Sequence, residues 1–160
     1  MYTEFNQLSK NSKVWVYLSN RKFTSHEVIE IEGYLQSFVT QWTAHNQDLK
    51  ASYQIYRDCA IVLSVDESLN DASGCSIDSS VRAIREIEAK YKVELFDRNL
   101  VTYEAEGQMM VVSMDEFKNL LVQGKVNDDT IVLNPLVKTK EELETAFELP
   151  LQKSWHQQLI

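Results

Sequence analysis

The most apolar run of the sequence, residues 59–65, limits how this chain can fold. It is far shorter than the roughly 20 residues that cross a bilayer, but its length and its Val and Ile content are typical of a strand buried on both faces. The preceding residues 50–56 alternate in polarity, and only Arg57 and Asp58 separate the two segments. The pattern predicts a hairpin whose second strand lies centrally in a sheet.

Helices are predicted on both sides of this hairpin in the sequence. Residues 14–18 are β-branched and aromatic, which predicts a strand, and Thr24 and Glu27 then have the spacing of a capping box. We expect this first helix to end near residues 44–46, and a second helix to cover about residues 78–92. The apolar stripes at helical spacing are Val28, Ile31, Leu35, Phe38, Val39 and Trp42 in the first helix, and Val81, Ile84, Ile87 and Tyr91 in the second.

Beyond Arg98 the predicted elements are shorter. Residues 100–103 and 109–112 have the composition of strands, and the turn between them contains Gly107, which suits a positive φ. The remaining predictions are helices that begin after Ser113 and Thr139, a C-cap at Gly124, a short strand at 130–133, and a final helical segment that presents Leu151, Trp155 and Leu159 on one side.

The order of the first six elements is β-α-β-β-α-β, the split βαβ arrangement of ferredoxin-like folds. We therefore predict an α+β fold: a ferredoxin-like βαββαβ core with a mostly antiparallel sheet, followed by C-terminal strand and helix additions. The length of 160 residues fits a single domain over residues 1–160.

The charge of the chain argues against a nucleic-acid partner. The formal net charge is −8, and residues 59–130 contain fourteen acidic and seven basic side chains, with no basic stripe elsewhere. The polar residues 1–13 lack the apolar core of a signal peptide. Two cysteines are too few for a disulfide framework. We expect a cytoplasmic protein with reduced thiols and with no membrane or nucleic-acid partner.

The segment most suited to chemistry is the polar stretch 66–78, which connects the apolar strand to the second helix. Cys75 lies close to a helix N-terminus, where the helix dipole can favour a thiolate, and Asp66 and Glu67 could act as an acid and base pair. These three are the candidate catalytic residues, while Cys59 is expected to be inert packing. The candidate binding residues are Ser73, Gly74, Cys75, Ser76, Asp78 and, in the hairpin turn, Arg57.

A plain structural interpretation of this stretch competes with the chemical one. Four acidic residues surround Cys75 and oppose a thiolate, and Ser76 or Asp78 is an ordinary helix N-cap. A phosphatase loop needs five residues between Cys and Arg, whereas six separate Cys75 from Arg82. The calcium-loop and zinc patterns are not met either, so we predict no cofactor and no metal site. A hard cation held by Asp66, Glu67 and Asp71 is the weaker alternative.

The chain resembles a small uncharacterised bacterial protein family of about this length whose members are commonly named "ABC transporter ATPase". The resemblance rests on residues 15–21, 42–45, 65–67, 73–78, 149–151 and 154–156. The family name does not fit the residues, because a transporter ATPase needs a P-loop. The only Gly-Lys pair here, Gly124-Lys125, is followed by Val126 rather than Ser or Thr. The resemblance therefore implies a bacterial origin but no activity.

Two functions remain open from the sequence. The first is a non-enzymatic module that binds a small ligand or a protein partner, with self-association as a further possibility. This hypothesis follows because caps and periodic faces account for most of the pattern. The alternative is a small enzyme that uses the 66–78 loop, with Cys75 as nucleophile, or with Asp66 and Glu67 as an acid and base pair or a metal site.

Overall fold

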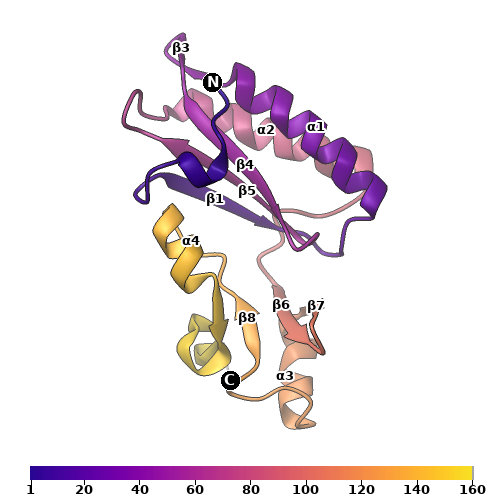
Figure 1. The fold of residues 1–160 in the computed structure, drawn as a ribbon. Helices are drawn as coiled ribbons and strands as arrows, with labels where there is room; N and C mark the ends of the chain where they lie inside the picture. Colours follow the sequence, from indigo (N-terminus) through magenta and orange to yellow (C-terminus); the bar gives the residue numbers. More distant parts are fainter. Residues whose placement is uncertain (160) are drawn as a thin grey trace.

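The computed structural model describes residues 1–159, and its first half is a three-stranded antiparallel sheet covered on one face by two helices (Figure 1). The strand order is β1-β5-β4, and Leu63 of β5 lies between Trp15 of β1 and Tyr53 of β4. Every residue of β5 is buried, which confirms the prediction of a central strand from the apolar run. The elements of this half are η1 (Phe5–Gln7), β1 (Lys13–Leu18), α1 (Ser25–Gln41), β2 (Thr43–Ala44), β3 (Gln47–Asp48), β4 (Lys50–Tyr56), β5 (Ala60–Asp66) and α2 (Gly74–Tyr91).

The first helix begins as predicted and ends earlier than predicted. Thr24 accepts a hydrogen bond from the Glu27 N–H, and the Glu27 carboxylate accepts one from the Thr24 N–H, so the capping box is present. The chain leaves the helix at Trp42 and forms the small hairpin of β2 and β3, whose turn residues His45 and Asn46 both have positive φ. The predicted end near 44–46 was wrong because residues 43–44 pair as a strand across this tight turn, so the helix has to end before them.

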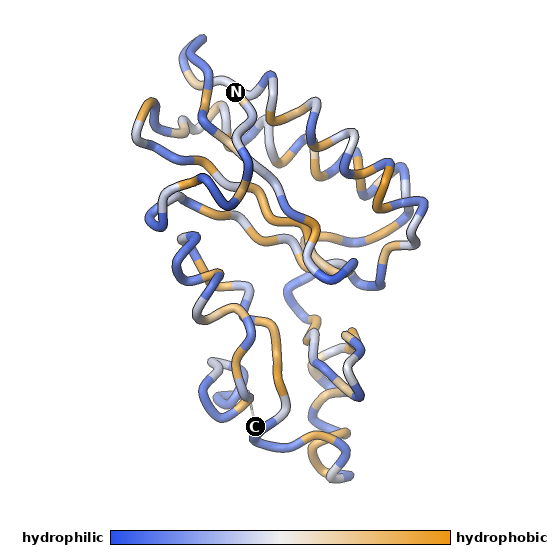
Figure 2. Tube along the Cα trace, in the orientation of Figure 1, coloured by the Kyte–Doolittle hydropathy of each residue, from blue (hydrophilic) through white to orange (hydrophobic). Residues whose placement is uncertain are grey.

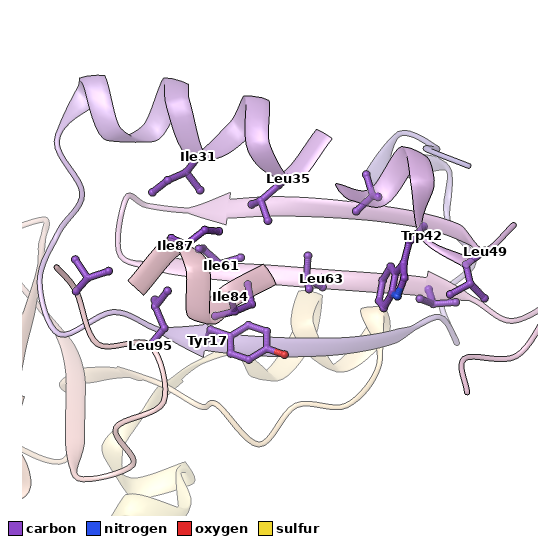
Figure 3. Close-up of a cluster of buried hydrophobic side chains, with 14 of the residues drawn as sticks. Tyr17, Ile31, Leu35, Trp42, Leu49, Ile61, Leu63, Ile84, Ile87 and Leu95 are labelled. Atoms are coloured by element: carbon purple, nitrogen blue, oxygen red, sulfur yellow. The ribbon is translucent and has the colours of Figure 1, made fainter. Parts of the chain in front are cut away.

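The main core lies between α1, α2 and the sheet (Figure 3). Ile31, Leu35 and Val39 of α1 are fully buried, as are Ile61 and Leu63 of β5. Figure 2 shows that apolar residues follow the strands of this sheet and recur along both helices. The periodic stripe that predicted α1 is therefore the face that holds it on the sheet.

The fourth strand expected for a ferredoxin-like sheet does not pair with β1. The strand predicted at 100–103 is β6, and it pairs with β7 and β8 in a second sheet of order β7-β6-β8-β9. A two-residue turn of Glu106 and Gly107, both with positive φ, joins β6 to β7, so β6 finds its partner locally. The α+β class is confirmed, and the first sheet has three strands rather than the four that were predicted.

The second half contains two helices and a tail of 3₁₀ turns around this second sheet. The predicted helix after Thr139 stops at Ala146, and Pro150 ends a short strand that pairs with β8. The tail forms 3₁₀ turns rather than one helical segment, and the side chain of Leu159 lies outside the described part. The elements are β6 (Leu100–Ala105), β7 (Gln108–Ser113), α3 (Met114–Val122), β8 (Ile131–Leu133), α4 (Lys140–Ala146), β9 (Glu148–Pro150), η2 (Leu151–Lys153) and η3 (Trp155–Leu159).

The second half packs on the face of the first sheet that the helices leave open. Val14 and Val62 of the first sheet share a buried cluster with Leu133 and Phe147. Cys59 belongs to the same cluster, and burial raises the pKa of its thiol to about 11. Within residues 1–159, none of the helices is both long and apolar enough to span a membrane.

Candidate functional site

A groove of about 860 Å³ runs along the outer edge of β1, at the position that a fourth strand would occupy. Three stretches of the chain form most of it: β1, the segment 95–100 between α2 and β6, and the segment 135–139 before α4, and Trp155 of the C-terminal tail completes the lining. Its size is within the usual range for a ligand site. The lining residues are Asn11, Lys13–Leu18, Leu95, Phe96, Asp97, Arg98, Leu100, Pro135, Leu136, Val137, Lys138, Thr139 and Trp155.

The peptide groups of β1 alternate between the sheet and the groove. Ser19 donates its N–H to the Cys59 carbonyl of the neighbouring chain segment at 2.9 Å, whereas Val14 donates its N–H to the Lys138 carbonyl at 3.0 Å. In an antiparallel pair the direction reverses at every residue. Val16 and Leu18 therefore direct their N–H and C=O groups to the same side as Val14, which is the groove.

The edge is closed at each end and open in the middle. At one end Lys13 and Thr139 form a single antiparallel β-bridge, and the N–H of Lys138 then donates to the Glu142 carboxylate at 2.7 Å rather than to β1, so this segment pairs no further along the strand. At the other end Asn20 donates its N–H to the Glu94 carbonyl at 3.1 Å. Between these closures, β5 lies opposite Val16 and Leu18 on one side, and no strand of the described chain lies opposite them on the groove side.

The walls of the groove are apolar and are fixed by aromatic contacts. On one side Phe96 packs edge-on against Tyr17, with 5.3 Å between the ring centroids, and the Arg85 guanidinium covers the Phe96 ring at 3.9 Å. On the other side Val137 is buried, while Leu136 is 58% exposed. Leu136 extends the apolar lining of the groove to its exposed rim.

The rim of the groove carries a local excess of positive charge on a chain whose net charge is −8. Lys13 pairs with Glu67 at 2.9 Å. Arg98 and Lys138 are exposed, and neither makes an ion pair with a carboxylate of residues 1–159. Asp97 is the one acidic side chain of the lining.

The first predicted catalytic carboxylate, Asp66, is a buried structural group. It is 3% exposed and accepts hydrogen bonds from the N–H groups of Ser9 and Ser68 at 3.2 and 3.0 Å, with the Lys50 ammonium at 3.5 Å. Burial raises the pKa of Asp66, but the two N–H donors and Lys50 together outweigh burial and hold this pKa at about 2. Asp66 therefore stays charged at neutral pH and ties the start of the loop to residue 9.

The second predicted carboxylate, Glu67, also holds the loop. It accepts the N–H of Ala72 at 2.9 Å, in addition to its ion pair with Lys13. No group of three or more metal-ligating side chains is present among residues 1–159. The two carboxylates hold the loop, and each accepts hydrogen bonds or an ion pair from donors of its own chain.

The second helix begins at Gly74, four residues earlier than predicted. Ser73 is the N-cap, and its hydroxyl and that of Ser76 each accept the N–H of the other residue, at 3.1 and 2.7 Å. The sequence analysis missed this start because the box pairs two serines rather than Ser with Glu. Cys75 thus lies in the first turn of the helix and is exposed, and Asp78 is exposed on the same helix.

Arg57 lies in the β4–β5 turn with a positive φ, and its guanidinium contacts the second half of the chain. It donates to the Glu104 carboxylate at 2.6 Å, to the Glu148 carboxylate at 3.2 Å and to the Gly107 carbonyl at 3.1 Å. The sequence analysis named Arg57 as a candidate binding residue. The carboxylates that it contacts belong to its own chain, and the contact fastens the two halves together.

The structure therefore places the predicted site residues in three locations. Asp66 and Glu67 are at the start of the loop, Ser73 to Asp78 form the helix start, and Arg57 is at the junction of the halves. None of them lines the groove. Sequence reasoning missed the groove because its walls are about 80 and 120 positions away from β1 along the chain, and no local pattern reports such proximity. In comparisons with known proteins, the chain matches no family model, no curated protein and no solved structure.

Proposed function

We propose that this protein is a non-enzymatic binding module whose ligand site is the groove along β1. In this proposal the core is ferredoxin-like and its fourth strand position is left open for the ligand. The observation that carries the proposal is the open edge at Val16 and Leu18, which forms the floor of an apolar groove of about 860 Å³. Unpaired strand edges are normally covered or blocked in soluble proteins, so a recessed apolar edge suits a binding role.

The polar groups of the groove suit binding better than bond-breaking chemistry. They are the peptide groups of β1 and side chains at the rim, of which Arg98 and Lys138 carry uncompensated charge. Fixed donors and cations of this kind orient a ligand and hold its anionic part. The enzyme hypothesis at Cys75 stays a prediction that Cys75→Ala would test. The lack of a nucleic-acid partner also belongs to this proposal, on the basis of the net charge of −8. So does a cytoplasmic location, on the basis of two cysteines that are too few for a disulfide framework.

The test uses 8-anilinonaphthalene-1-sulfonate, an apolar anionic dye that fluoresces in apolar sites. Leu136 lines the groove and Val122 does not, yet both are exposed, at 58% and 88%. Leu136→Asp places a negative charge in the groove and is expected to weaken dye binding about tenfold, which corresponds to about 1.4 kcal/mol. Val122→Asp is the matched control and should bind like the unmodified protein. Equal binding by both variants, with circular dichroism unchanged, would contradict the proposal.

A further inference from the structure

We infer that the ligand of this groove is an extended peptide strand, apolar in its middle and acidic toward its C-terminus, which adds to β1 as an antiparallel fourth strand. The inference rests on the proposed function and names the chemical class of the ligand. Its starting point is that the floor of the groove is a row of peptide groups, and a peptide backbone is the ligand that matches such a row.

The register of the added strand follows from the alternation along β1. One residue of the ligand lies opposite Val16 and exchanges two hydrogen bonds with it, accepting its N–H and donating to its C=O. Two residues toward the N-terminus of the ligand, a carbonyl accepts the N–H of Leu18. The closures at Val14 and Asn20 limit the paired stretch to a few residues, so side-chain contacts must supply much of the affinity.

The walls determine which side chains such a strand carries. Successive side chains of a strand point to opposite faces. One face of the added strand meets Tyr17 and Phe96, and the other meets Val137 and Leu136. Both walls are apolar, so residues on both faces of the ligand are apolar over the paired stretch.

The charge at the rim determines the direction of the acidic end. An antiparallel ligand runs from the Leu18 end of β1 toward the Val14 end, and its C-terminal side arrives beside Lys138 and Lys13. Lys138 has no carboxylate partner in the described chain, and acidic side chains or a C-terminal carboxylate would supply one. Every strand pair named in both sheets is antiparallel, which is consistent with this direction.

A peptide fits this edge better than a second copy of the chain. The edge of β1 lies at the bottom of a groove, between the segments 95–100 and 135–139. The β1 strand of another copy is recessed between the same two segments, so two such edges cannot approach to the 4.7–4.9 Å spacing of paired strands. A single extended chain has no such obstruction.

The experiment measures fluorescence anisotropy with the labelled peptide Ser-Gly-Val-Phe-Val-Leu-Val-Glu-Glu and with backbone N-methylated versions of it. N-methylation removes one N–H, and only alternate N–H groups of an added strand face β1. If the odd-numbered N–H groups of the peptide face β1, the even-numbered ones face away, or the reverse. We expect methylation in the set that faces β1 to weaken the affinity about tenfold or more, and methylation in the other set to change the affinity less than about threefold. Replacing Glu-Glu by Lys-Lys should weaken binding, and the variant Lys138→Ala should reduce that difference.

Three results would overturn the inference. If the peptide does not bind while the dye still does, the groove is a ligand site but not for a strand. If methylation of odd-numbered and of even-numbered positions weakens binding equally, the peptide does not pair with β1. If the protein forms a dimer that Val16→Pro dissociates, the edge serves a second copy. Loss of dye binding as well would instead contradict the proposed function itself.

Discussion

The backbone N–H of Val14 donates a hydrogen bond of 3.0 Å to the carbonyl of Lys138, and this bond marks where the paired part of the outer edge of β1 ends. Together with the bond from the Lys140 N–H to the Ser12 carbonyl at 2.9 Å, it forms a β-bridge that attaches the chain segment before α4 to the start of the strand. Because Lys138 then donates its own N–H to Glu142, the segment turns away, and Pro135 has no N–H with which to pair. The rest of the edge stays open, and the groove follows from this divergence.

The buried carboxylate of Asp66 predicts a stability difference that depends on pH. Its pKa is about 2 in the folded protein against an ordinary value of 3.8, so its stabilisation is complete above about pH 4 and is lost as the pH falls to 2. Asp66→Asn should lower the free energy of unfolding by about 2 kcal/mol at pH 7 and by much less at pH 2. Urea unfolding at both pH values measures this, with the exposed Asp71→Asn in the same loop as control. A deficit of equal size at pH 2 would show that the charge of Asp66 is not the cause.

His156 predicts a second pH effect, in a higher range. It is 2% exposed beside Ser154, and burial lowers the pKa of its imidazole to about 4 from 6.5. Since the unfolded chain takes up the proton first, stability should fall between about pH 6.5 and pH 4, by about 3 kcal/mol in total. The variant His156→Asn should lack this slope, and the exposed His45→Asn should keep it. An unchanged slope in His156→Asn, followed by chemical unfolding, would contradict the assignment.

The clamp at Arg57 predicts energetic coupling between the two halves. A double-mutant cycle with Arg57→Gln and Glu104→Gln should give a coupling free energy of about 0.5–1 kcal/mol, because both side chains are about one-third exposed and solvent screens the pair. Gln keeps an unbranched side chain at the positive φ of residue 57, so the backbone contribution cancels. Strictly additive effects would mean that the contact does not contribute to stability.

The two thiols should differ in accessibility. Cys75 is exposed in the first turn of α2, whereas Cys59 is buried and burial raises the pKa of its thiol to about 11. Iodoacetamide at pH 8 should therefore modify Cys75 and leave Cys59 intact in the folded protein. Mass spectrometry of the digested protein identifies the site, and Cys75→Ser should show no modification until urea is added. Rapid modification of Cys59 without urea would contradict its placement in the core.

The sequence predicted the elements whose signals are local. The stripe through Ile31, Leu35 and Val39 indicated the buried face of α1, and the box of Thr24 and Glu27 located its start. Two less common signals were missed. They are the paired serines that begin α2, and the left-handed residues His45 and Asn46 that form the turn after α1. These features are also local, but the residue types that form them occur in many other conformations and so do not predict them.

The candidate site was less predictable for a different reason. The strand β6 has a composition that suits either a ferredoxin-like sheet or a hairpin with β7, and only the competition between partners decides. Because β6 pairs with β7 in a hairpin, the outer edge of β1 has no fourth strand within residues 1–159, and the groove lies at this position. Its walls come from residues 95–100 and 135–139. By contrast, Asp66 was predicted as a candidate catalytic residue because it ends a central strand, but its carboxylate accepts backbone hydrogen bonds that hold the loop.

The central claim, that the open edge of β1 is the binding site, is tested most directly by amide hydrogen exchange. Trp15 and Tyr17 direct their N–H groups to β5 and should be protected, whereas Val16 and Leu18 should exchange at least about tenfold faster. Adding the peptide described above should slow exchange at Val16 and Leu18 and leave Trp15 and Tyr17 unchanged. Strong protection of Val16 and Leu18 in the free protein, or exchange that the bound peptide does not slow, would contradict the account.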